Sequence, residues 1–244
     1  MSLEVLLFLV LQILAVYGES ELPDFLRVCK RNEPNLSSCI VDSIENLRPY
    51  LITGVPEYNI PSIEPLIMEN LLADETPNLK ITVTNASAWG CSDFIIKNLS
   101  ASSSFHEVNV DIDIPKLRIR SHYGVNGKIL VLPIKGSGDL EANISDIRAN
   151  AKFKTELYEK DGTTYLRHKH IKLKVLTGNG NVRLEDIVNG DTVLLKLIND
   201  IINKNLEPFL EQLMPLIERA LEKVFLRIAN GIIDTFTYDQ LFPV

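Results

Sequence analysis

Apolar residues in the last fifth of the chain recur every three or four positions, which is the spacing of an α-helix. One stripe passes through Phe209 and Leu213, and a second passes through Leu210 and Ile217. Together they cover well over half of the circumference of a helix that we predict from Thr192 to Phe236. This helix would be on the order of 65 Å long at ~1.5 Å per residue, so the rest of the chain must cover its apolar sides.

Between about residues 79 and 184 the hydrophobic period changes to two, which is typical of β-strands. The alternation is clearest over residues 106–114 and 170–175. Pro115 interrupts the first of these runs, and the apolar positions beyond it change phase. This change predicts a bulge or a sharp bend.

Glycine-rich segments separate the alternating runs. They lie at residues 124–127, 136–138 and 178–180, and Asp161-Gly162 is a further turn signal. We therefore expect the chain to turn at each of these places.

The segment before the strands is predicted to begin with a helix. Residues 22–51 carry an apolar stripe at helical spacing, and Gly54 and Pro56 provide a stop. Residues 55–65 contain three prolines, so we expect an extended connector there.

Strands with one apolar and one charged face belong to an antiparallel sheet that is solvated on one side. The sheet then has one dry face, and the C-terminal helix has apolar surface to cover. We therefore predict an α+β fold in which a strongly curved antiparallel sheet wraps around the long C-terminal α-helix.

The N-terminus has the pattern of a signal peptide. Residues 5–16 form an apolar run interrupted only by Gln12. The run is shorter than the about 20 residues of a membrane span, but it fits a signal-peptide core. We expect a signal peptide at residues 1–18 and a secreted, extracellular product without a stable membrane anchor. Residues 19–244 show no linker, so we expect a single domain and a monomer.

An oxidising compartment favours a disulfide between Cys29 and Cys39, which are ten residues apart. Cys91 then has no partner, and we interpret it as a buried thiol rather than a nucleophile. Glycosylation sequons begin at Asn35, Asn85, Asn98 and Asn143. Asn35 lies inside the disulfide loop, so we expect it to be the least accessible of the four.

Neither nucleic-acid binding nor catalysis is indicated by the residues. The net charge is -7, and it becomes -6 when the segment with Glu4 is removed, which disfavours a nucleic-acid partner. Nucleophile-elbow, zinc-protease and P-loop motifs are absent from the sequence. His168 and His170 share one face of a strand, but Lys172 and Lys174 continue that face. We expect no metal and no cofactor.

Several segments resemble the takeout and juvenile-hormone-binding protein family of insects, over essentially the whole mature sequence. They are the pair Cys29 and Cys39, the connector Gly54–Leu66, the block Tyr123–Gly138 and the tail Tyr238–Pro243. The resemblance implies an elongated apolar tunnel between helix and sheet, and carriage of hydrophobic small molecules, juvenile hormone in some members. It also implies a link to feeding, chemosensation or clock-controlled expression.

Two features depart from the family pattern. The best-studied hormone carriers have a second disulfide, whereas Cys91 has no partner in the later half of this chain. Glu64-Pro65 stands where the family often has Asp-Pro. In lacking a second disulfide, the chain resembles the takeout members of the family. This resemblance does not favour juvenile hormone itself as the ligand.

We expect ligand-facing residues to come from the helix and from the apolar face of the sheet. The candidates are Trp89, Val110, Ile112, Tyr123, Phe153, Tyr165, Leu173, Leu197, Ile201, Phe209, Leu213 and Ile217. Tyr123 and Tyr165 can each offer a hydroxyl to the polar end of a ligand. The sequence leaves open that Trp89 packs in the core and that both tyrosines are half-exposed beside turns.

The combined interpretation is a secreted carrier of an elongated hydrophobic small molecule that is terpenoid, juvenile-hormone-like or fatty-acid-like. The disulfide-tethered N-terminal arm is the candidate lid. Two alternatives stay open, a protein-interaction module whose apolar groove holds a partner chain, and a lipid-processing enzyme.

Overall fold

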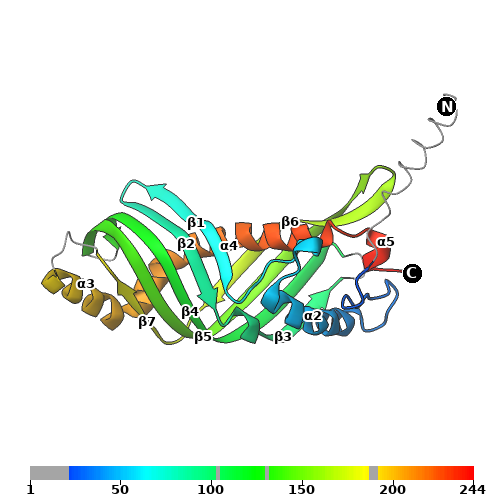
Figure 1. The fold of residues 1–244 in the computed structure, drawn as a ribbon, viewed down its shortest axis with the longest axis horizontal. Coiled ribbons are helices and arrows are strands. Elements are labelled where there is room, and N and C mark those ends of the chain that lie inside the picture. The colour runs from blue at the N-terminus through cyan, green and yellow to red at the C-terminus, as the bar shows by residue number, and fades with distance from the viewer. Residues whose placement is uncertain (1–21, 103–104, 130–131, 187–191) are drawn as a thin grey trace, which may run out of the picture.

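A computed structural model describes residues 22–102, 105–129, 132–186 and 192–244. Its strands form an antiparallel sheet that curves around a C-terminal helix (Figure 1). The predicted α+β class and the curved sheet are therefore confirmed. The predicted signal peptide lies outside the described residues, and within them no helix is long and apolar enough to cross a membrane.

The sheet is built around two very long neighbouring strands. The strands are β1 (Leu66–Thr76), β2 (Leu79–Trp89), β3 (Ile95–Ala101), β4 (Glu107–Ile129), β5 (Leu132–Lys160), β6 (Thr163–Leu176) and β7 (Gly180–Leu184). They pair in the order β1-β2-β4-β5-β6. In addition, β3 pairs with the first half of β4, and β7 pairs with β5.

The C-terminal helix is two helices, so the prediction of one continuous helix is wrong. They are α3 (Thr192–Lys204) and α4 (Leu206–Ile233), and a short helix α5 (Tyr238–Leu241) follows. The break falls at Asn205, whose φ of -125° is not helical. Its side-chain Nδ2 donates to the carbonyl oxygen of Ile201 at 2.8 Å, a local bond by which asparagine ends helices.

The N-terminal helix is shorter than predicted. Helix α2 spans Leu36–Thr53, whereas residues 22–35 contain turns and loop. Gly54 ends the helix as predicted, because its φ of 77° carries the chain out of the helical region. The connector is not extended throughout, since it contains the 3-10 turn η1 (Pro56–Tyr58) and a bridge between Val55 and Ile60.

Pro115 does not create a bulge against β5. The pairing of Ile114 with Ile147 continues at Lys116 with Ser145 without a register shift. Instead, both strands change phase together, and Ile114 and Leu117 both pack against the same core cluster. The neighbour of β4 on its other side changes here from β3 to β2.

The glycines at 124–127 and 136–138 lie inside β4 and β5, so the turns predicted there are wrong. These glycines accommodate neighbouring backbone instead. A Cβ on Gly138 would lie 1.9 Å from the carbonyl oxygen of Glu185, and one on Gly127 would lie 2.3 Å from that of Asn78. The predicted turn at Asp161-Gly162 is confirmed. The turn predicted at residues 178–180 is wrong, because the chain only bends there and β7 continues along β5 in the register of β6.

Polar side chains of the helices bond to the outer edges of the sheet. Strands β6 and β7 each pair with β5 alone, which leaves one edge of each open. Asn199 and Asn203 of α3 bond to the main chain of β7. Glu218, Glu222 and Asn230 of α4 bond to the main chain of β6. The helices thus cover edges that could otherwise pair with another chain.

Candidate ligand-binding site

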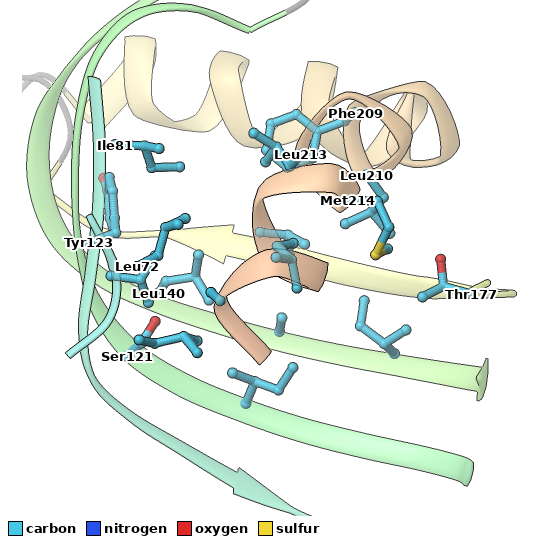
Figure 2. Close-up of a pocket in the computed structure, with 18 of the residues that line it drawn as sticks. Leu72, Ile81, Ser121, Tyr123, Leu140, Thr177, Phe209, Leu210, Leu213 and Met214 are labelled. Atoms are coloured by element: carbon cyan, nitrogen blue, oxygen red, sulfur yellow. The ribbon is translucent and has the colours of Figure 1, made fainter. Parts of the chain in front are cut away.

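A cavity of about 250 Å³ lies between the concave face of the sheet and the first half of α4. Figure 2 shows Ile81, Tyr123 and Leu140 on the sheet side and Phe209 and Met214 on α4. Strand β1, the end of β6 and β7 also contribute to its wall. This volume is close to the lower end of the ~300–1,000 Å³ that is usual for ligand pockets.

The wall of the cavity is almost entirely apolar. Among the described residues that line it, none is Asp, Glu, Lys, Arg or His. Hydroxyl groups come from Ser121, Tyr123 and Thr177. Such a wall favours an apolar occupant, because each methylene transferred from water contributes about 0.8 kcal/mol.

The hydroxyl group of Tyr123 is already in use. It donates a hydrogen bond to the carbonyl oxygen of Glu185 at 3.0 Å, and the residue is buried. Burial, with the charge of Asp186 as a smaller cause, raises the pKa of Tyr123 to about 12. The phenol therefore stays protonated, and its proton is donated to a main-chain carbonyl.

The cavity brings together a subset of the residues predicted to face a ligand. These are Tyr123, Phe209, Leu213 and Ile217. The other eight do not line it. Leu197 and Ile201 lie on α3, where Leu197 is 54% exposed. Trp89 is half-buried in β2, opposite Arg118 of β4, whose guanidinium lies 6.0 Å from the centre of its ring.

The remaining predicted residues lie elsewhere on the sheet. Val110 and Ile112 are half-buried where β4 pairs with β3. Phe153 contacts the ring of His168 with centroids 4.7 Å apart, and Tyr165 stacks on Tyr158. Leu173 is buried on β6, and its main-chain N–H donates to Glu222 of α4.

Sequence reasoning missed much of the wall. Leu71 and Leu72 belong to β1, a strand that was not predicted, and Met214 was not selected on the helix. On β4, every second residue from Leu117 to Val125 lines the cavity. That alternation was visible in the sequence and could have identified this wall.

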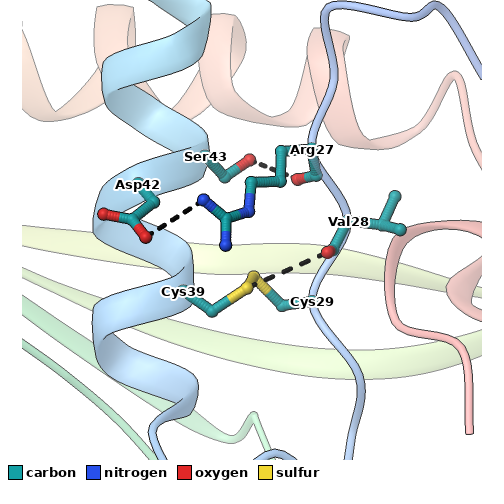
Figure 3. The surroundings of a disulfide bond; sticks show 6 residues. All are labelled: Arg27, Val28, Cys29, Cys39, Asp42 and Ser43. Atoms are coloured by element: carbon teal, nitrogen blue, oxygen red, sulfur yellow. Dashed lines mark hydrogen bonds and ion pairs between the residues drawn. A yellow bond between two sulfur atoms is a disulfide. The ribbon is translucent and has the colours of Figure 1, made fainter.

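The N-terminal arm lies away from the cavity, so its expected role as a lid finds no support. Cys29 and Cys39 form the predicted disulfide (Figure 3). Next to it, Arg27 pairs with Asp42 at 3.1 Å. Among the described residues, those of the arm and of α2 contribute nothing to the cavity wall.

The disulfide region packs against the C-terminal tail. The cysteines share a buried cluster with Phe105, and Phe242 packs against it. Arg31 pairs with Asp239 and lies 4.0 Å from the centre of the Tyr238 ring. The disulfide loop and the C-terminal tail therefore pack together at one end of the described structure (Figure 1).

Two groups outside the cavity, the imidazole of His168 and the thiol of Cys91, have shifted pKa values. His170 pairs with Lys154 and His168 with Thr155, so Lys169 is an extra residue between them, and the two histidines do not share a face as predicted. His168 is half-buried, its ring lies 2.9 Å from the Thr155 hydroxyl, and burial lowers its pKa to about 4. Burial, with Glu64 as a smaller cause, raises the pKa of Cys91 to about 12, so its thiol stays protonated.

The sequons differ in exposure. The asparagines at 35, 85 and 98 are exposed, so the expectation that Asn35 is the least accessible is wrong. Asn143 is half-buried, and its Nδ2 donates to Asn181 at 3.3 Å.

Comparison with known proteins identifies this architecture. A family model described as haemolymph juvenile hormone binding protein matches residues 5–243. The chain belongs to this family. Haemolymph juvenile hormone binding proteins bind hydrophobic ligands, and the position of the apolar cavity agrees with that property.

Relatives within the family are distant in sequence but match over most of their length. The circadian clock-controlled protein daywake of Drosophila melanogaster is 23% identical over 231 residues, which cover 90% of this chain and 88% of that protein. A protein of Schistocerca gregaria named "Putative beta-carotene-binding protein" is 20% identical over 218 residues, which cover 87% and 86%. The crystal structure of Epiphyas postvittana Takeout 1 superposes with a TM-score of 0.73 at 20% identity, and covers 89% of this chain and 100% of that one. This last likeness confirms the fold.

Proposed function

We propose that this protein is a carrier that holds one elongated hydrophobic small molecule between the sheet and α4. The observation that carries the proposal is a cavity of about 250 Å³ whose described wall holds no ionisable group other than the bonded Tyr123. A terpenoid or an aliphatic lipid of ten to fifteen carbons would gain a gross ~8–12 kcal/mol from transfer out of water. Immobilisation costs reduce this gain, which places the dissociation constant between micromolar and nanomolar.

We further propose that the carrier acts outside the cell. The apolar run at residues 5–16 and the family's description as haemolymph proteins support cleavage after residue 18 and secretion of one domain, residues 19–244. The daywake relatives are named as circadian clock-controlled, which supports clock-linked expression of this chain.

The carrier function is tested by titrating the purified protein with N-phenyl-1-naphthylamine, an uncharged fluorescent probe that brightens in apolar sites. We expect saturable binding of one probe per chain. Ala142→Phe adds a ring to the buried cavity wall and should weaken binding at least tenfold. Ser137→Ala, at an exposed position of the same strand, is the matched control.

Two outcomes contradict the carrier function. One is no probe binding by the wild type, which would favour a partner chain as the occupant. The other is equal binding by wild type and by a folded Ala142→Phe protein, which would place the probe outside this cavity. Leu213→Trp fills the cavity from the side of α4 and provides a second variant if Ala142→Phe does not fold.

A further inference from the structure

The solvated face of β5 and β6 carries a strip of basic side chains. On β6 the side chains of this face alternate with the buried Ile171 and Leu173. The chain as a whole has a net charge of -7, so a basic surface is a local exception. The five cations of this basic strip are all exposed, and they are Arg148, Lys152, Lys154, Lys172 and Lys174.

Two lysines of the basic strip lie directly opposite each other. Lys152 of β5 is the register partner of Lys172 of β6. The Cβ atoms of such partners lie about 5 Å apart, and like charges there destabilise a sheet. The fold therefore tolerates a repulsion that an anionic partner would remove.

Carboxylates of the protein neutralise only part of the basic strip. The carboxylate of Glu107 on β4 pairs with Lys152 at 2.8 Å, although Glu107 is the register partner of Lys154. Glu218 of α4 pairs with Lys174 at 2.9 Å. These two contacts account for two of the five cations.

The other three cations have no carboxylate of their own. Among the described residues, Arg148, Lys154 and Lys172 form no ion pair. Asp113 is the register partner of Arg148 on β4, but it pairs with Lys97 at 4.0 Å. Three positive charges are therefore available to a partner.

The excess of positive charge continues along β6. Arg167 and Lys169 both pair with the single carboxylate of Glu156, at 2.6 and 2.9 Å. Within residues 167–174, four of eight residues are Arg or Lys. Short segments of this composition are typical of surfaces that bind heparin or nucleic acid.

The basic strip is long and narrow. At ~3.3 Å per residue, positions 148 to 154 of β5 span about 20 Å, whereas neighbouring strands are only ~5 Å apart. The next strand, β4, places Asp111 and Asp113 beside the strip. An anionic membrane lying on this face would also meet these two acids. The shape therefore favours a linear anion over a flat anionic surface.

The composition of the basic strip does not resemble a protein–protein interface. Such interfaces are depleted in lysine and have an apolar centre that is rich in aromatic residues. Here lysines occupy the centre, and the exposed Leu176 lies at one end, as the register partner of Arg148. A polymer that carries many regularly spaced anionic groups fits this arrangement better than a folded acidic protein.

We propose that the basic strip binds a linear sulfated polysaccharide, and that Arg148, Lys154 and Lys172 contact its sulfate groups. The proposal goes beyond the carrier function and does not depend on the cavity. Secretion, as proposed above, would bring the protein into contact with such chains. The cavity lies against the opposite, concave face, so a bound hydrophobic ligand and a polysaccharide do not compete.

The test measures binding of a heparin dodecasaccharide to the whole secreted protein by isothermal titration calorimetry at pH 7.4. We expect saturable binding at about 0.15 M NaCl that weakens at least about fivefold at about 0.5 M, because salt screens the charges and the protein displaces counterions from the polymer. Desulfated heparin keeps its carboxylates but has fewer charges, and should bind at least about fivefold more weakly.

Lys154→Gln/Lys172→Gln removes two of the three unpaired charges and should weaken heparin binding about 3- to 10-fold. Lys128→Gln/Lys135→Gln is the matched control, because it removes two exposed lysines of β4 and β5 outside the strip. The two variants have the same net charge, and the control should lose less than about twofold. Arg148→Gln/Lys172→Gln provides a second variant within the strip.

Stability gives a further readout. Lys154→Gln/Lys172→Gln should keep or raise the midpoint of urea denaturation, because Lys152 no longer faces a like charge. A lower midpoint would show that these lysines stabilise the fold, which overturns the argument from repulsion.

Four binding results would overturn the proposal. They are no heparin binding at about 0.15 M NaCl, equal losses in the strip variant and its control, tighter binding of single-stranded DNA than of heparin, and equally tight binding of vesicles of phosphatidylcholine and phosphatidylserine. The carrier function is read separately from the titration with N-phenyl-1-naphthylamine, which should give the same affinity with and without saturating heparin. Displacement of the probe by heparin would place the polysaccharide at the cavity and also overturn the proposal.

Discussion

The phenolic oxygen of Tyr123 lies 3.0 Å from the carbonyl oxygen of Glu185 and donates a hydrogen bond to it. This bond joins the inner wall of β4 to the segment that follows β7. A hydroxyl group in the cavity wall can therefore stabilise the fold rather than bind the ligand.

Tyr123→Phe should lower the free energy of unfolding by about 1–3 kcal/mol, because the Glu185 carbonyl loses its donor in a buried place. The affinity for the uncharged probe should change less than twofold. Chemical denaturation and probe titration measure the two effects, with Tyr165→Phe as the control outside the cavity. A large loss of affinity with unchanged stability would instead assign the phenol to the ligand.

Glu218→Ala should destabilise the protein by about 1–3 kcal/mol. The buried Glu218 carboxylate accepts from the main-chain N–H of Val175 and from Lys174, each at 2.9 Å, so its loss leaves an edge N–H of β6 unpaired. Lys174→Ala is the matched variant and should cost less than about 1 kcal/mol, because the lysine side chain is 64% exposed. Equal costs for the two variants would show that the ion pair, rather than the main-chain bond, holds the edge.

Acid should weaken the protein through His168. Burial lowers the pKa of His168 from 6.5 to about 4, so the unfolded chain takes up a proton in a range where the folded protein does not. Stability that is present above pH 6.5 is therefore lost as the pH falls towards 4, and this residue accounts for about 2 kcal/mol between pH 7 and pH 5. Urea denaturation at the two pH values should show a smaller difference in His168→Gln, and an unchanged one in the exposed variant His170→Gln.

Replacing both Cys29 and Cys39 by Ser should lower the free energy of unfolding by about 2–3 kcal/mol, the usual effect of opening a small loop. The rate of probe release should not change, because the disulfide packs against the C-terminal tail and not against the cavity. Stopped-flow release from the folded variant measures this rate. Faster release would restore the arm as a lid.

The fold was largely predictable because its periodicity is strong. The alternating run at residues 106–114 lies within β4 except for its first residue, the run at 170–175 lies within β6, and the helical stripes lie within α3 and α4. Strand β1 was not predicted, because a register shift between Asn70 and Leu72 breaks its alternation of apolar and polar residues. The break between α3 and α4 at Asn205 was not predicted, because apolar residues continue at helical spacing across it.

The glycines of the central block show a different limit. Their spacing in the sequence predicts that Gly127 and Gly138 are turn residues. In the structure each lies inside a strand, where the missing side chain leaves room for a neighbouring main-chain segment. That requirement depends on Asn78 and Glu185, which are remote in sequence.

The cavity could be predicted only in part. Periodicity tells which face of an element is apolar, but not whether opposing side chains fill the space in front of it. Phe209 and Leu213 were found because α4 faces the cavity with this stripe. Val110 and Ile112 show the same alternation as Ile119 and Tyr123, yet they lie where β3 pairs with β4 and the cavity does not extend.

Photolabelling tests the position of the ligand most directly. A dodecanol analogue with a diazirine in its chain, irradiated on the protein and mapped by peptide mass spectrometry, should label residues 117–125, 134–147 and 209–221. Excess 1-dodecanol should suppress the labelling. Labels confined to the disulfide loop, to Trp89 or to β3 would contradict a ligand site between the sheet and α4.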